Sequence, residues 1–185
     1  GGFKFYARKE VKDIISYLRV INNVKDTVSW ERIINTPPRG IGDKARLELK
    51  TAGWNIEAIE QKTKLPFRTW ILNKNALSTT ELMDKILEAT GYIHWLDDGS
   101  DESLYRIENI KELRSVTVEF PELETFLENV ALIESSDKPQ RKNSQELNDF
   151  VSIMTAHSAK GLEFDTVFLV GLEEGLFPHS QSLAE

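Results

Sequence analysis

The stretch Thr155-Ala-His-Ser-Ala-Lys-Gly-Leu-Glu-Phe164 combines several side chains that could hold a phosphate-bearing ligand. It follows a short apolar run at 150–154 that is typical of a buried strand, and open α/β sheets place ligands where such strands end. Thr155, His157 and Lys160 supply a hydroxyl, a ring donor and a positive charge, whereas the carboxylate of Glu163 suits a sugar hydroxyl better than a phosphate. The alternative is a capped loop in which His157 satisfies backbone groups.

A second candidate is the segment Thr36-Pro-Pro-Arg-Gly-Ile-Gly-Asp-Lys-Ala-Arg46. Gly40 and Gly42 flank one apolar residue just before a predicted helix, so the backbone there can approach a phosphate closely with several amides able to donate. The basic residues of the segment would make such binding depend on salt. The alternative is a helix-initiating turn whose apolar residue, Ile41, packs into the core.

Composition limits the chemistry that the chain can perform. The 185 residues include no cysteine and three histidines well separated in sequence, which argues against a thiolate site and a zinc cluster. A phosphate loop of the form Gly-x4-Gly-Lys-Ser/Thr does not occur, so the chain cannot cycle a nucleotide by itself. The net charge of −7 argues against a surface that is basic throughout, but it allows local phosphate sites. The four tryptophans lie in helical patterns and are expected in the core.

The elements that would position these segments are mostly helices. Apolar residues recur at helical spacing from Arg8 to Asn22, and a further helix before Pro37 is stopped by the proline. Asp43 is expected to cap a helix that runs through Leu49, and other helices are expected at about 55–62, 66–76, 79–90, 103–116 and 121–134. Residues 135–146 are polar and predict a linker. Short apolar runs at 3–5, 150–154 and 166–170 predict strands, the last two neighbouring and parallel. The expected fold is therefore an α/β sheet interrupted by a helical block.

The same segments resemble the UvrD/Rep/PcrA family of superfamily 1 DNA helicases. The stretch from Thr155 to Phe164, with Val-Phe-Leu-Val-Gly-Leu-Glu-Glu-Gly-Leu-Phe-Pro178 after it, is similar to helicase motif V and its extension. The stretch Asn35-Thr-Pro-Pro-Arg-Gly-Ile-Gly-Asp43 resembles the family's Gly-Ile-Gly element, which is similar to a helix–hairpin–helix. The resemblance implies a partial RecA-like parallel sheet, motor domain 2A, built from residues 1–23 and 149–185, with residues 24–148 as a mainly α-helical 2B insertion.

The resemblance also implies which residues contact DNA and nucleotide. Single-stranded DNA would be held by Thr155, His157 and Lys160, and the ribose of the nucleotide would be approached by Glu163. The duplex ahead of the fork would be contacted by Thr36, Arg39, Gly40, Ile41, Gly42 and Lys44. No catalytic residue and no metal ligand is expected in this chain.

The function implied for the parent protein is that of an ATP-dependent helicase moving 3′ to 5′ on DNA in repair or replication. ATP and Mg²⁺ would serve the full-length parent, with neither expected on this part alone. Its partners would be single-stranded DNA and the duplex junction, the 1A and 1B motor domains of the same chain, and repair or transcription proteins. A cytoplasmic location is expected, because no apolar run approaches the roughly 20 residues of a membrane helix.

Two alternatives of other classes stay open. A non-enzymatic, helix–hairpin–helix-like DNA-binding module would function without any phosphate loop. A protein-docking helical domain would show no salt-dependent affinity for forked DNA. A helicase relative fused to a nuclease is a third possibility, within the helicase class.

Overall fold

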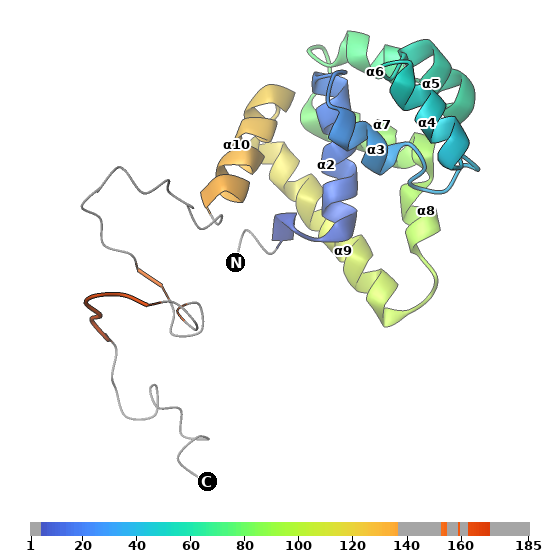
Figure 1. Ribbon diagram of the computed structural model, residues 1–185. Coiled ribbons are helices and arrows are strands. Elements are labelled where there is room, and N and C mark those ends of the chain that lie inside the picture. Colours follow the sequence, from blue (N-terminus) through green and yellow to red (C-terminus); the bar gives the residue numbers. More distant parts are fainter. Residues whose placement is uncertain (1–4, 137–152, 155–158, 160–162, 171–185) are drawn as a thin grey trace. The chain divides into compact units, whose positions relative to one another are not determined.

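The computed structural model describes residues 5–136, 153–154, 159 and 163–170 of the 185. The chain forms two compact units, residues 1–140 and 141–185. The first unit is built from helices, and α4, α5 and α6 lie together at one of its ends (Figure 1). In chain order the helices are α2 (Lys9–Asn22), α3 (Thr27–Ile33), α4 (Asp43–Thr51), α5 (Ile56–Thr63), α6 (Phe67–Asn73), α7 (Thr79–Thr90), α8 (Tyr92–Leu96), α9 (Asp101–Glu119) and α10 (Leu123–Ser136).

Helix α2 is the centre of the first unit and packs against α3, α6, α7, α9 and α10. Its apolar side chains from Val11 to Ile21 are almost fully buried, as expected of a helix covered on all sides. One buried carboxylate also lies in it: Asp13 accepts hydrogen bonds from Arg32 Nε and Tyr92 Oη, each at 2.7 Å. Burial raises the pKa of Asp13, and both partners oppose that rise by stabilising the charged form.

Helix ends follow local sequence signals. Ser78 caps α7 through a capping box in which Ser78 and Glu81 each accept from the other's backbone amide. Asp26, Asn55 and Ser100 cap α3, α5 and α9 with their side-chain oxygens. These caps and the apolar periodicity explain why the helices predicted at 55–62 and 79–90 are confirmed within a residue or so.

Three local predictions need correction. The N-cap of α4 is Gly42, with Asp43 as the first helical residue. Helix α10 begins at Leu123, and Pro121 lies before it, where its carbonyl accepts the amide of Thr79 at 2.8 Å. The short helix α8 was not predicted, because five residues are too few to show helical periodicity.

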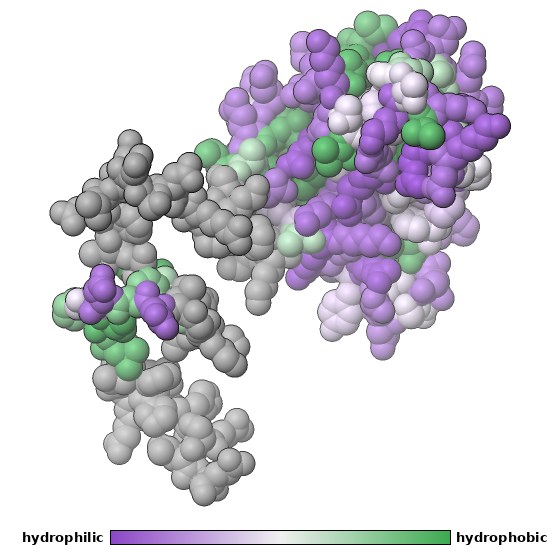
Figure 2. All heavy atoms as spheres, viewed as in Figure 1, coloured by the Kyte–Doolittle hydropathy of each residue, from purple (hydrophilic) through white to green (hydrophobic). Residues whose placement is uncertain are grey.

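The predicted fold class, an α/β fold with a partial RecA-like parallel sheet, is wrong. The described part of the chain contains helices and no strand. Residues 166–170 belong to neither a helix nor a strand in the described part of the chain, and Phe168 and Val170 are 85% and 86% exposed. Figure 2 shows these hydrophobic residues at the surface of the described part of the second unit. A strand needs a neighbouring backbone to receive its amides and carbonyls, and an apolar run cannot show that such a neighbour exists.

The predicted strand at 3–5 fails for a different reason. Residues 5 and 6 are helical, and the rings of Phe5 and Tyr6 meet edge to face at 5.2 Å between centroids. Both side chains are buried in the core of the helical unit. Their burial favours the helical conformation over the strand that the alternating pattern predicts. Residues 3–4 and 150–152 of the predicted strands lie outside the described residues. The proposed division into residues 1–23, 24–148 and 149–185 stays a prediction.

Candidate nucleic-acid interface

The turn Gly40–Ile41–Gly42 between α3 and α4 is an exposed backbone surface. Gly40 has a φ of +72°, in the left-handed region that favours glycine. A Cβ added to Gly40 or to Gly42 would meet no atom within 4 Å. Ile41 between them is 6% exposed and belongs to the hydrophobic core. Ile41 therefore anchors the turn, and the exposed backbone of Gly40 and Gly42 is available to a partner.

Helix α4 leaves its first amides without a side-chain cap. Gly42 takes the usual N-cap conformation, with φ −78° and ψ 179°, but has no side chain to accept from them. The first intrahelical bond in α4 is donated by Arg46 to the carbonyl of Gly42 at 3.0 Å. The amides of Asp43, Lys44 and Ala45 precede it and have no intrahelical acceptor. This end of α4 can therefore donate to an anion.

Charges beside the turn differ in their availability. Lys44 is exposed and makes no hydrogen bond or ion pair within the described residues. Arg46 pairs with Asp43 of the same helix, and Lys50 pairs with Glu31 of α3. Because surface pairs of this kind contribute little, both cations could exchange their partner for a phosphate. Lys44 could bind a phosphate without such an exchange, because it has no ion-pair partner within the described residues.

Asn35 holds the inner side of the turn. Its Oδ1 accepts the backbone amide of Arg39 at 2.7 Å and that of Ile41 at 3.2 Å. These two residues flank Gly40, so one side-chain oxygen determines the direction of the backbone on both sides of it. Asn35 was not among the predicted site residues, although a polar residue just before a proline-containing turn is a recognised turn signal.

Tyr17 of α2 holds the segment that leads into the turn. Its hydroxyl donates to the carbonyl of Thr36 at 2.6 Å and accepts from Arg39 Nη2 at 2.6 Å. Burial raises the pKa of Tyr17 to about 12, so its hydroxyl keeps its proton and remains a donor at neutral pH. Tyr17 was predicted only as part of an amphipathic helix, because no local pattern links residues 17 and 36.

Of the predicted duplex-contacting residues, Arg39 and Thr36 are engaged within the chain. Arg39 Nη1 also donates to the carbonyl of Ile33 at 3.2 Å, so both terminal nitrogens of its guanidinium have internal acceptors. The Thr36 hydroxyl donates to the carbonyl of Arg32 at 3.0 Å. The predicted duplex-contacting residues lie in one continuous segment that includes the turn and the start of α4: Thr36, Arg39, Gly40, Ile41, Gly42 and Lys44. Of these, Gly40, Gly42 and Lys44 are exposed.

The other predicted site is described only in part. Thr155, His157 and Lys160 lie outside the described residues. Glu163 is described and exposed, and makes no hydrogen bond or ion pair there. The predicted contacts with single-stranded DNA and the ribose therefore stay predictions.

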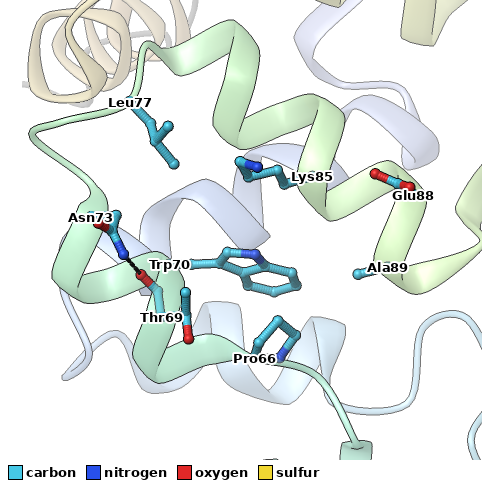
Figure 3. A pocket seen from close by; sticks show the side chains of 8 residues that line it. All are labelled: Pro66, Thr69, Trp70, Asn73, Leu77, Lys85, Glu88 and Ala89. Carbon is cyan, nitrogen blue, oxygen red and sulfur yellow. Dashed lines mark hydrogen bonds between the residues drawn. The ribbon is translucent and has the colours of Figure 1, made fainter.

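The predicted burial of the tryptophans is confirmed for three of four. Trp30, Trp54 and Trp70 are at most 3% exposed, whereas Trp95 is 39% exposed. Trp70 forms the floor of a pocket of about 600 Å³ between α6 and α7 (Figure 3). The rest of the pocket is lined by Pro66, Thr69, Asn73, Leu77, Lys85, Glu88 and Ala89. None of the predicted site residues lines it, so it is not part of the candidate interface.

The described residues include neither a candidate metal site nor a candidate membrane-spanning helix. No group of histidine, aspartate and glutamate side chains suited to a metal ion occurs among the described residues. None of the helices in the described ranges is long and apolar enough to cross a membrane.

Comparison with known proteins places the chain among proteins related to DNA helicases. It is 41% identical over 213 residues to a protein of Bacillus subtilis (strain 168) named ATP-dependent DNA helicase PcrA. Proteins of the same name from Staphylococcus epidermidis and Staphylococcus aureus are 36% and 34% identical. The match covers 99 to 100% of this chain and 28 to 29% of these relatives.

The family described as UvrD-like helicase C-terminal domain matches residues 1–185. The chain belongs to this family, which confirms the resemblance derived from its motifs. Because the chain spans less than a third of the relatives' length, the activity of the whole protein is a matter for proposal.

Proposed function

We propose that this chain is the DNA-contacting part of an ATP-dependent DNA helicase, and that the Gly40–Ile41–Gly42 turn binds the duplex backbone. The observation that carries the proposal is the match of the whole chain to ATP-dependent DNA helicase PcrA at 41% identity. The outward glycines and the uncapped first turn of α4 support a contact at this place. The parent would move 3′ to 5′ along single-stranded DNA during repair or replication.

The described residues assign a physical task to each part of the turn. Amides from Gly42 to Ala45 would donate to phosphate oxygens, and such contacts fix position without reading base sequence. Lys44 would neutralise a phosphate and release a counterion. Thr155, His157 and Lys160 would hold the single strand, and Glu163 would approach the nucleotide ribose, in keeping with the motif resemblance.

ATP and Mg²⁺ would be bound mainly by other parts of the protein. The sequence contains no phosphate loop, and the described residues hold no carboxylate cluster suited to a metal. ATP bound to the full-length protein would supply the energy of strand separation. The residues of this chain would hold the DNA during strand separation.

Two measurements on the full-length protein test the proposal. The first is strand separation with ATP on duplexes carrying a 3′ or a 5′ single-stranded tail. We expect unwinding of the 3′-tailed substrate only. Binding without ATP-dependent unwinding would instead support the non-enzymatic DNA-binding module.

The second measurement is the affinity for forked DNA at several ionic strengths. Lys44→Ala should weaken binding and reduce the salt slope by about 0.9, the value for one lost phosphate contact. Lys85→Ala serves as the matched control, because Lys85 is an exposed lysine of α7 outside the turn. An affinity that does not depend on salt would contradict the proposal and support the protein-docking domain.

A further inference from the structure

We propose that Tyr17 and Asn35 are positioning residues for the duplex contact, and that Arg39 acts through Tyr17 as a brace of the turn rather than as a phosphate ligand. This inference rests on the proposed function of the Gly40–Ile41–Gly42 turn. It adds the residues that keep that turn in a binding conformation.

Asn35 selects which amides of the turn face outward. Its Oδ1 accepts the amides of Arg39 and Ile41 and so directs both of them inward. The same two bonds hold Gly40 between them at its positive φ. A side chain at position 35 without an acceptor would leave both amides unpaired and remove the interaction that orients the turn.

Tyr17 connects the turn to the rigid core. Its ring is fully buried and lies parallel to that of Phe67, with centroids 6.1 Å apart and an interplanar angle of 8°. Phe67 contacts Trp30 and Trp70 edge to face, at centroid distances of 4.8 and 5.1 Å. The hydroxyl that holds Thr36 is therefore fixed by an aromatic cluster drawn from α2, α3 and α6.

Arg39 joins the two ends of the segment before the turn. Its guanidinium donates both to the Tyr17 hydroxyl and to the carbonyl of Ile33 at the end of α3. With these bonds made, the charge of Arg39 is directed toward the protein, while Lys44 remains exposed. Loss of the Tyr17 hydroxyl would thus release Thr36 and Arg39 together.

The position of the turn matters because amides bind phosphate through short, directional hydrogen bonds. A turn that samples several conformations must be ordered again on binding, which lowers its affinity. Loss of the Tyr17 hydroxyl should weaken binding by about threefold to tenfold, the factor that corresponds to one ordinary hydrogen bond. The salt slope should not change, because no charge that neutralises a phosphate is removed.

The test compares Tyr17→Phe with Tyr92→Phe in the full-length protein. Both tyrosines are buried and donate through the hydroxyl, but Tyr92 donates to Asp13 rather than to the turn. We expect both variants to lower the melting temperature. Only Tyr17→Phe should weaken binding of forked DNA, with an unchanged salt slope. Equal affinities of the two variants would overturn the inference, and so would a reduced slope in Arg39→Gln.

A second pair removes side-chain acceptors in the same way. Asn35→Ala deletes the acceptor of the turn, whereas Asn55→Ala deletes the cap of α5, where Oδ1 accepts the amide of Ala58 at 3.1 Å. Weaker DNA binding in Asn35→Ala alone is expected, and equal binding by the two variants would contradict the role of Asn35.

Gly42→Val separates failure of this inference from failure of the proposed function. Weaker binding by Gly42→Val with normal binding by Tyr17→Phe would overturn only the positioning role. Normal binding by Gly42→Val would remove the turn as a contact and the inference with it.

Discussion

Substitution of Gly42 should separate the stability of α4 from its affinity for DNA. Gly42 has the N-cap conformation but no side chain, and a Cβ there would meet open space. Serine at this position can accept an amide of the first turn, and it is favoured over glycine by a few tenths of a kcal/mol. Valine fits the same backbone angles but cannot cap, and it should cost roughly 0.5–1 kcal/mol.

The two variants should therefore shift stability in opposite directions. A few tenths of a kcal/mol raises the melting temperature by about 1 °C in a domain of this size, and the valine variant should lose about 1–4 °C. Circular dichroism of the 185-residue chain on heating measures both shifts. A large loss with valine would mean that the space beside Gly42 is not open.

Duplex affinity should fall in both variants. Serine would occupy an amide that otherwise donates to phosphate, and valine would keep the DNA backbone at a distance. A hydrogen bond to a charged group contributes about 1.5–3 kcal/mol, so the loss should be about tenfold or more. Anisotropy titration of the full-length protein with forked DNA measures it. A serine variant that is more stable and binds normally would refute the assignment of these amides.

Three further predictions test the description of the helical unit. Ser78→Ala removes the capping box of α7 and should destabilise the chain by about 1 kcal/mol in urea unfolding, whereas Ser115→Ala on the exposed side of α9 should have little effect. Gly40→Val forces a β-branched residue to a φ of +72° and should cost roughly 1–3 kcal/mol, more than Gly42→Val in the same assay. Tyr17 has a pKa of about 12 in the folded state, against 10.0 ordinarily, so its contribution is complete below pH 10 and is lost as the pH rises through 12. Unfolding at a series of pH values should show a loss of about 2 kcal/mol from this group by pH 12, and an equal loss in Tyr17→Phe would contradict the assignment.

Helices and their ends were predictable because their causes are local. The apolar spacing from Val11 to Ile21 and the Ser78–Glu81 box lie within a few residues of one another. Family membership was predictable for a similar reason, since it rests on contiguous motifs around Gly40 and Glu163.

The α/β prediction failed because a strand depends on partners that a local pattern cannot reveal. Residues 166–170 have the composition of a buried strand, yet they are exposed and form no strand within the described residues. Residues 3–5 showed the alternation of a strand, but Phe5 and Tyr6 are helical, and their burial against helices favours that conformation.

Amino-acid order alone determined the periodicity of the helices, the glycines that permit a tight turn and the motifs that identify the family. Only the tertiary structure decided what holds that turn. Tyr17 and Thr36 are separated by 19 residues, and their hydrogen bond exists because α2 and α3 pack together. It also decided that Arg39 points inward while Lys44 remains exposed, since a charge takes its role from the acceptors that folding brings within reach.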